Sequence, residues 1–345
     1  MKIAVKLALW GFTIVLLSTL ILGSCTKPDV IETITNPFEL IGKINKDTTL
    51  TSNNVWTLNG RVSISPGNTL TIEAGTTIKA KPGSGSNASC LIISKGAKIN
   101  AQGTFQHPII FTTTEDGANE NVRGMWGGLI ILGNAKGSFV GGVNKMQIEG
   151  IPASDTLGLY GGNNDNDNSG ILTYVSIRHG GANIGEGNEI NGLTLGCVGD
   201  GTVINNIEIA CNSDDGLELF GGSVNVDNVL LWSISDDCLD IDQGYKGTVS
   251  NCLAITSEVT DHLIELDGGE GIYNPNFNIL NFNFLDTVIR STGSGSNIHC
   301  RSQANGFVSL NKNTTIKNEI GTNVLIDTLG IELDYNIFNW SYYYE

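Results

Sequence analysis

The chain has 345 residues, with 35 Asp and Glu against 19 Lys and Arg, and its formal net charge is −16. This charge argues against nucleic acids and anionic membrane surfaces as partners, because binding either of them requires a basic patch. It is compatible with bound Ca²⁺ and with neutral partners.

Residues 1–24 have the pattern of a bacterial lipoprotein signal peptide. Lys2 and Lys6 precede an apolar run from Leu7 to Leu22, and small residues then lead to Cys25. By this resemblance Cys25 is acylated and becomes the new N-terminus, so the protein is expected in the cell envelope as an outer-membrane lipoprotein, facing the periplasm or the outside. The alternatives are an ordinary secretory signal and a transmembrane anchor, although the run is short for a span.

Residues 25–48 are expected to form a lipidated tether and an N-terminal cap, after which short strands recur. Gly is abundant, at 44 residues, whereas Pro is limited to 7. Strand-like segments separated by Gly, Asn and Asp include Val62–Ile64, Thr69–Ile72, Pro108–Phe111 and Gly128–Leu132. Many short, regularly spaced strands indicate an all-β fold, and a repeat of about twenty residues is typical of a solenoid.

Three successive coils show the repeat most clearly: Ile204–Gly222, Val226–Gly244 and Val249–Gly269. Their aligned apolar residues alternate with polar ones and should point inward. Asn206, Asn228 and Asn251 share one position, which predicts an internal asparagine ladder that satisfies backbone groups at a sharp turn. We therefore predict a single-stranded right-handed parallel β-helix over residues 49–310.

Residues 311–345 end in the aromatic sequence FNWSYYYE. An uncovered solenoid end would expose both core and strand edges, so we expect this tail to form a C-terminal cap. A tail that binds a partner is the alternative.

Several segments carry a family resemblance. The sequences MWGGLIILGNA, LYGGNNDNDNSGILTYVSIRHGG and DDGLELFGGSVNV, in this order, resemble exported Gram-negative lipoproteins that have a pectate-lyase-like right-handed β-helix and no established activity. The resemblance covers about Gly60 to Gly269. It implies a fold more than a chemistry, and we expect a monomer.

Six cysteines follow Cys25, at positions Cys90, Cys197, Cys211, Cys238, Cys252 and Cys300. An exported compartment permits disulfides, but six cysteines allow fifteen pairings. Several of them occupy apolar positions of the repeat, where a thiol serves as a small core residue.

The sequence SDDGLELFGG (Ser213–Gly222) aligns position by position with SDDCLDIDQG (Ser235–Gly244). Because residues one coil apart stack at about 4.8 Å, Asp214 should lie over Asp236, and Asp215 over Asp237. Carboxylates this close either have raised pKa values or share a cation, which makes all four candidate Ca²⁺ ligands. The simpler alternative is that these aspartates only form turns.

The same residues resemble the active site of polygalacturonase-type glycosidases. The stretch Asn212–Gly216 is similar to their Asn-Thr-Asp-Gly motif, and Asp236-Asp237-Cys238 matches their Asp-Asp-Cys. The resemblance implies that one of Asp215, Asp236 and Asp237 is a general acid while the others activate a water for inversion. It also implies a role for His262, because the next coil of those enzymes carries a Gly-His-Gly motif and His262 lies near the corresponding place in this sequence. Their Arg-x-Lys clamp is incomplete, because Arg290-Ser291-Thr292 holds only the arginine.

Two further sites are weaker candidates. The loop Asn163–Gly170 begins like an EF-hand, with Asp165 and Asp167 as Ca²⁺ ligands, but Ser176 stands where the bidentate Glu belongs. A looser Ca²⁺ site and a hydrated loop remain the two interpretations. The four histidines show no metal-ligand spacing, so we expect each in a turn or on the surface.

Phe220, Trp232 and Tyr245 are candidate aromatics for a sugar-binding face, with core packing as the alternative. The sequence thus predicts non-enzymatic binding or display of a glycan or another envelope component, stabilised by Ca²⁺. A polysaccharide-cleaving inverting glycosidase that uses Asp215, Asp236 and Asp237 is the second hypothesis.

Overall fold

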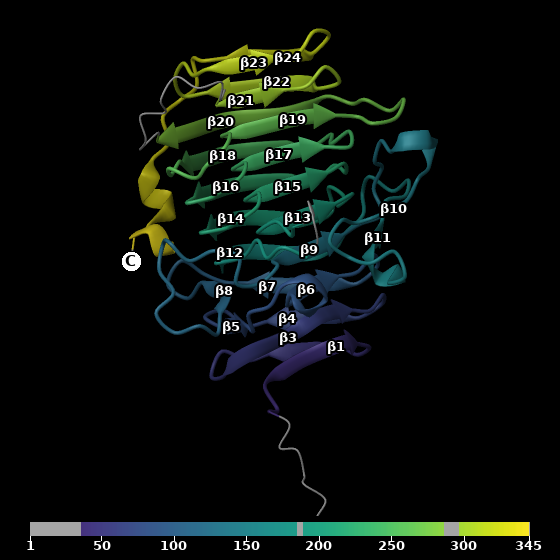
Figure 1. Cartoon of the computed structure of the whole chain (residues 1–345), viewed down its shortest axis with the longest axis vertical. Helices are drawn as coiled ribbons and strands as arrows, with labels where there is room; N and C mark the ends of the chain where they lie inside the picture. The colour runs from purple at the N-terminus through teal and green to yellow at the C-terminus, as the bar shows by residue number, and fades with distance from the viewer. Residues whose placement is uncertain (1–35, 185–188, 286–296, 345) are drawn as a thin grey trace, which may run out of the picture. The chain divides into compact units, whose positions relative to one another are not determined.

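Among the described residues, one parallel sheet of 22 strands extends from Glu39 to Asp327 (Figure 1). The computed structural model describes residues 36–184, 189–285 and 297–344, so the proposed lipidation residue Cys25 lies outside the described residues. The strands stack coil upon coil, which confirms the predicted all-β right-handed parallel β-helix. In the described part of the chain, no helix is long and apolar enough to cross a membrane.

The coils build three faces. One face is a stack of short strands, namely β6 (Cys90–Ile93), β9 (Leu129–Leu132), β13 (Leu193–Gly196), β15 (Leu217–Phe220), β17 (Leu239–Asp242), β19 (Ile264–Gly268), β21 (Ile298–Cys300) and β23 (Ile316–Asn318). The other two faces are formed by longer strands that bend once: β12 (Gly170–Arg178), β14 (Val203–Ala210), β16 (Asn225–Trp232), β18 (Thr248–Ile255) and β20 (Phe277–Leu285), with β22 (Asn305–Leu310) and β24 (Asn323–Asp327) continuing the stack.

The first coils show how a long strand arises. The two halves of β12 pair with two separate strands of the preceding coil, β7 (Lys98–Gln102) and β8 (Ile109–Thr113). The remaining strands of this region are β1 (Glu39–Ile44), β2 (Thr48–Leu50), β3 (Val55–Ile64), β4 (Thr69–Ile72) and β5 (Thr77–Ala80). A two-stranded antiparallel pair, β10 (Met146–Gln147) and β11 (Leu159–Tyr160), projects from the helix.

The bend in each long strand is made by a residue in the left-handed region, with φ of 54° at Asn206, 56° at Asn228 and 54° at Asn251. Asparagine is among the few residues that adopt this conformation readily, which explains its repetition. The predicted alignment is confirmed, but the ladder is half-buried rather than internal. Its amides bond to side chains rather than to the backbone. Asn228 Nδ2 donates to Asn205 Oδ1 of the preceding coil at 3.0 Å, and Asn251 Nδ2 to Asp227 Oδ1 at 2.8 Å, whereas Asn206 donates to its neighbour Asn205.

The core consists of aliphatic columns that run through the stacked coils. Ile207 pairs with Val229 and then Cys252, as the alternation of apolar and polar residues predicted. Each of the six described cysteines is buried, so the interpretation of a thiol as a small core residue is the one the structure supports.

The ends of the helix differ from the expected boundaries of 49 and 310. Strand β1 already pairs with β3 within the segment expected to be a tether and cap, and β23 and β24 continue the sheet within the expected C-terminal cap.

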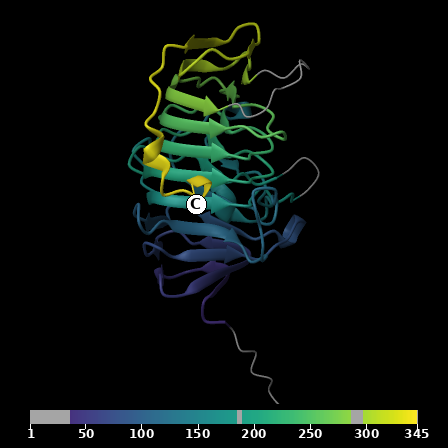
Figure 2. The ribbon, with the colours of Figure 1, turned by 90° about the vertical axis from the view of Figure 1, so that its left-hand side faces the viewer.

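The aromatic tail does not cap the end of the solenoid. It runs back along the side of the long strands (Figures 1 and 2). Phe338 is fully buried in a cluster with Leu230, Trp232, Leu253 and Ile255. These apolar residues occupy outward positions of β16 and β18, so the tail covers a hydrophobic stripe that would otherwise be exposed.

Candidate functional site

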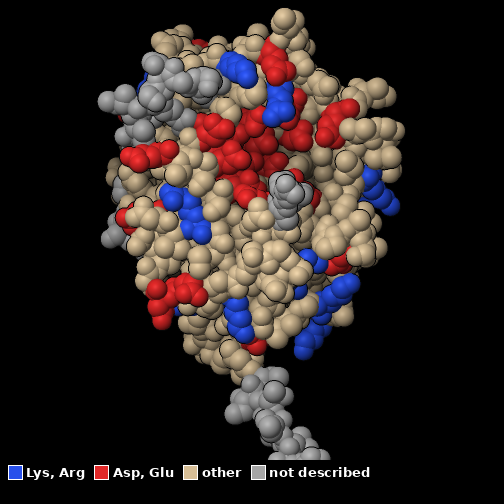
Figure 3. All heavy atoms as spheres, in the orientation of Figure 1, with Lys and Arg blue, Asp and Glu red and all other residues tan. Residues whose placement is uncertain are grey.

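Acidic side chains occupy the outward positions of the short-strand face. In β15 and β17, Leu217 and Leu239 point into the core, whereas the neighbouring Glu218 and Asp240 pair with each other on the outside. Asp240 pairs in turn with Glu265 of β19. Figure 3 shows the resulting patch of Asp and Glu over these strands, which we call the acidic face. Its members are Glu149, Glu189, Asp214, Asp215, Glu218, Asp236, Asp237, Asp240, Asp242, Glu265 and Asp267.

The aspartates of the turns before β15 and β17 stack as the repeat predicted. The backbone N–H of Asp237 donates to Asp215 Oδ1 at 3.0 Å, and the backbone N–H of His262 donates to Asp237 Oδ1 at 2.8 Å. Each of these two carboxylates therefore holds the turn of the next coil. Both are buried, with Asp237 only 2% exposed.

Polar side chains of the acidic face and of the neighbouring loops line a pocket of about 410 Å³. Its lining is Glu149, Glu189, Asn191, Asp214, Asp215, Glu218 and Asp236, and no Lys or Arg of the described residues contributes to it. Asp214, Asp215 and Asp236 each place a carboxylate oxygen within 4.8 Å of the other two, and Asp215, Glu218 and Asp240 do the same. The structure thus brings Asp214, Asp215 and Asp236 together at this pocket and adds glutamates that the sequence analysis did not single out, whereas the carboxylate of Asp237 lies against His262 instead.

Burial and mutual repulsion raise the pKa values of these carboxyl groups. Burial, followed by the negative charges of Glu149 and Glu189, raises the pKa of Asp214 to about 7. Burial and the charge of Asp240 raise the pKa values of Asp215 and Glu218 well above their usual range. Asp240 Oδ1 is buried with no hydrogen-bond partner among the described residues. Such a group is stabilised either by a proton or by a cation.

A cationic rim lies at one end of the acidic face. Arg301 donates to Glu265 Oε1 through Nε at 3.0 Å and through its terminal nitrogen at 2.7 Å, and it forms a 2.7 Å ion pair with Asp267. His262 Nδ1 lies 2.8 Å from Asp237 Oδ1. The rings of His262 and His299 are 5.4 Å apart, a juxtaposition that their spacing in the sequence did not indicate.

The loop that contains Asp165 and Asp167 is not part of the acidic face. Asp165 pairs with Lys246 at 3.2 Å and with Lys136 at 3.6 Å. Burial opposes the shift, but the backbone N–H of Lys136 and these two cations hold the pKa of Asp165 below the usual range. Asp167 Oδ2 accepts the backbone N–H of Asn134 at 3.1 Å. Both aspartates therefore fasten the loop to neighbouring coils.

The three aromatics expected to line a sugar-binding face are buried, which corrects that expectation. Phe220 is 5% exposed and packs against Tyr160. Trp232 is covered by Tyr342 and Tyr343 of the tail, each with its ring 5.5 Å away. Tyr245 lies in the core, and its hydroxyl donates to the carbonyl of Val224 at 2.7 Å.

Residues 42–332 match a family model described as a pectate-lyase-like β-helix domain. The chain belongs to this family. No curated protein and no solved structure matches the sequence. Membership places this β-helix domain in an architecture that supports many functions, so the chemistry must be argued from the acidic face itself.

Proposed function

We propose that the protein is a non-enzymatic envelope protein whose acidic face binds Ca²⁺ and, through the bound ion, a glycan. The observation that carries the proposal is the convergence of Asp214, Asp215 and Asp236, from two adjacent coils, on one acidic pocket. Calcium takes oxygen ligands at about 2.3–2.6 Å, so two oxygens on opposite sides of one ion lie about 5 Å apart. The carboxylate oxygens here lie within 4.8 Å of one another, close enough to share one ion.

A bound calcium ion would also allow this strongly acidic pocket to bind a glycan. A hydroxylated or uronate-bearing sugar brings oxygen ligands that complete the coordination of an exposed Ca²⁺. Without the ion, the carboxylates of the pocket would repel an acidic sugar. Asp236 is exposed, so the ion would be reachable from solvent.

Inverting hydrolysis is the second candidate, and one observation favours it. Burial and a hydrogen bond to Glu265 raise the pKa of Asp237 to about 7, although His262 opposes the shift, and this value is suited to a general acid. Its 2% exposure and its hydrogen bond to the next coil speak for a turn role instead. Arg290, the remnant of the substrate clamp, lies outside the described residues.

The test of calcium binding is a thermal shift with titrated Ca²⁺ after removal of metals by EDTA. Saturating ligand at about 100 times Kd should stabilise the folded protein by about 2.7 kcal/mol. The double substitution Asp214→Asn with Asp236→Asn should abolish this increment, whereas Asp116→Asn, at an exposed aspartate of another loop, should keep it. An increment that survives the double substitution would refute the proposed site.

A glycan array probed with and without Ca²⁺ then tests the ligand. We expect binding that requires the ion and fails in the double variant. Reducing-sugar release from polygalacturonate and from neutral glycans, compared between wild type and Asp237→Asn, separates the two functions. Release that the Asp237→Asn variant abolishes would establish the glycosidase instead.

The envelope location is tested separately at Cys25. Because the thioether to lipid forms at this residue, Cys25→Ser should release the protein from membrane fractions and stop the incorporation of labelled fatty acid. Membrane association that is unchanged in the variant would rule out the lipoprotein signal.

A further inference from the structure

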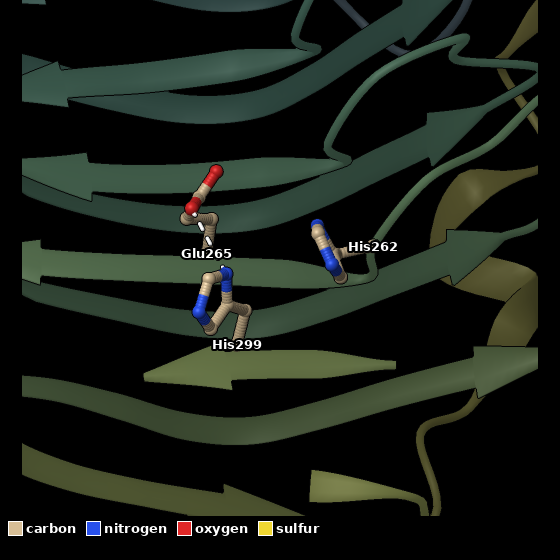
Figure 4. A group of neighbouring side chains, drawn as sticks. All are labelled: His262, Glu265 and His299. Atoms are coloured by element: carbon tan, nitrogen blue, oxygen red, sulfur yellow. Dashed lines mark ion pairs between the residues drawn. The ribbon is translucent and has the colours of Figure 1, made fainter. Parts of the chain in front are cut away.

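A second cluster lies at one end of the acidic face and consists of His262, Glu265 and His299. These residues follow the residues of the proposed calcium pocket in the sequence. Glu265 lies on β19 and His299 on β21, at paired positions of adjacent coils, while His262 ends the turn before β19. Figure 4 shows the three side chains grouped on the outside of the sheet. Each offers one donor atom within 4.8 Å of the other two.

The donors differ in kind from those of the calcium pocket. Two imidazoles and one carboxylate are the ligand set of borderline-soft ions such as Zn²⁺, whereas Ca²⁺ takes oxygen ligands. With Zn–N and Zn–O bonds of about 2.0–2.2 Å, ligand atoms around one zinc lie about 3.3–4 Å apart. Small side-chain movements would therefore bring the three donors to one ion.

The two nitrogens of His299 face different carboxylates. Nδ1 lies 3.2 Å from Glu265 Oε1, so it is the nitrogen beside the other two donors. Nε2 is buried and has no hydrogen-bond partner among the described residues, and it lies on the other side of the ring, 3.8 Å from Glu319 Oε1.

The surrounding residues hold the cluster as second-shell groups do in metal sites. Asp237 Oδ1 lies 2.8 Å from His262 Nδ1 and fixes that ring. Arg301 binds Glu265 Oε1 at 2.7 Å, which fixes the carboxylate. Three acidic residues, Asp237, Asp267 and Glu319, surround the cluster, against one positive charge on Arg301. This balance of charge favours the binding of a divalent cation.

We propose that His262, Glu265 and His299 form a second metal site, which takes a zinc-class divalent ion and is independent of the proposed calcium pocket. Three protein ligands leave a coordination position for water or for an atom of a bound ligand, as in open rather than structural zinc sites.

Cobalt(II) tests this site because it follows zinc in ligand preference and reports its coordination by absorption in the visible range. The full mature protein, prepared without a polyhistidine tag, is titrated with Co²⁺ and then with Zn²⁺. We expect one equivalent of Co²⁺ to bind with a visible band that Zn²⁺ abolishes. His299→Gln and His262→Gln should each weaken the affinity by about 100-fold. The matched control is His107→Gln, at an exposed histidine of another coil, and it should bind like wild type.

The two metal sites are distinguished by crossing the variants. His299→Gln should keep the Ca²⁺-dependent thermal shift, and the variant with Asp214→Asn and Asp236→Asn should keep the Co²⁺ band. Near-UV circular dichroism shows whether each variant is folded. If His299→Gln does not fold, His262→Gln is used for the test in its place. Wild type that binds no Co²⁺, or folded His299→Gln and His262→Gln variants that bind it as tightly as wild type, would overturn the proposal.

Discussion

In the absence of divalent ions the protein is expected to be more stable at about pH 5 than at about pH 8. Burial raises the pKa values of Asp214 and Asp242 to about 7, where an unfolded aspartate titrates near 3.9. Between these values the folded state binds more protons than the unfolded state. The free energy of unfolding therefore falls as the pH rises through about 7, and the contribution is fully present only below the unfolded pKa.

Several groups act in the same direction. Burial raises the pKa of Asp267 to about 6 although Arg301 opposes the shift. The hydrogen bond to Asp237 raises the pKa of His262, so its contribution is also lost as the pH rises. One pKa unit corresponds to about 1.4 kcal/mol. A group such as Asp242 would then contribute at most about 4 kcal/mol, and neighbouring carboxyl groups do not add independently because they titrate together.

Urea unfolding in EDTA at the two pH values measures the effect. Asp242→Asn should flatten the pH dependence and raise the stability at pH 8, because the amide is neutral at both values. Asp116→Asn, outside the acidic face, should leave the dependence unchanged. Adding Ca²⁺ at pH 8 should restore the stability lost by ionisation. A free energy of unfolding that rises toward pH 8 in EDTA would contradict the assignment of raised pKa values.

The parts of the fold that the sequence predicted are those set by neighbouring coils. Each coil repeats the same alternation, so the pairing of Ile207 with Val229, or of Asp215 with Asp237, follows from a constant offset along the chain. The glutamate and aspartate of LELF and LDID alternate with core leucines and could have been placed outside by the same rule. The acidity of the face was therefore readable, although its full extent was not recognised.

Contacts that do not follow the constant offset were not predictable in this way. His262 and His299 lie on adjacent coils, but the chain between them is longer than the repeat of about twenty residues. Trp232 was expected on an open face because the sequence does not show that the tail returns to cover it. One signal was available: the run Leu230-Leu231-Trp232 is apolar in both phases of the strand, which indicates that both sides of β16 are buried.

Glu208→Gln is expected to detach the C-terminal tail and to destabilise the protein by about 3–5 kcal/mol, the loss typical of breaking a buried ion pair. Glu208 is fully buried on the outward side of β14. Its carboxylate accepts three hydrogen bonds: one from Trp232 Nε1 at 2.9 Å, and one each from the backbone N–H groups of Tyr342 and Tyr343 at 3.0 and 3.1 Å. Arg178 Nε is 4.0 Å away, and its guanidinium lies over the ring of Tyr342.

Glutamine keeps the size of the side chain but replaces one acceptor oxygen with an NH₂ group, which can only donate hydrogen bonds. At least one of the N–H groups that face Glu208 would then lose its acceptor, and Arg178 would lose the carboxylate beside it. Denaturant unfolding measures the stability, and limited proteolysis followed by mass spectrometry should show cleavage near residue 333 in the variant before any other site. The matched control is Glu258→Gln, at an exposed glutamate, which should change neither. Deletion of residues 333–345 should make Glu208→Gln much less costly, because the donors of the tail are then gone. If the substitution is equally costly with and without the tail, Glu208 does not anchor it.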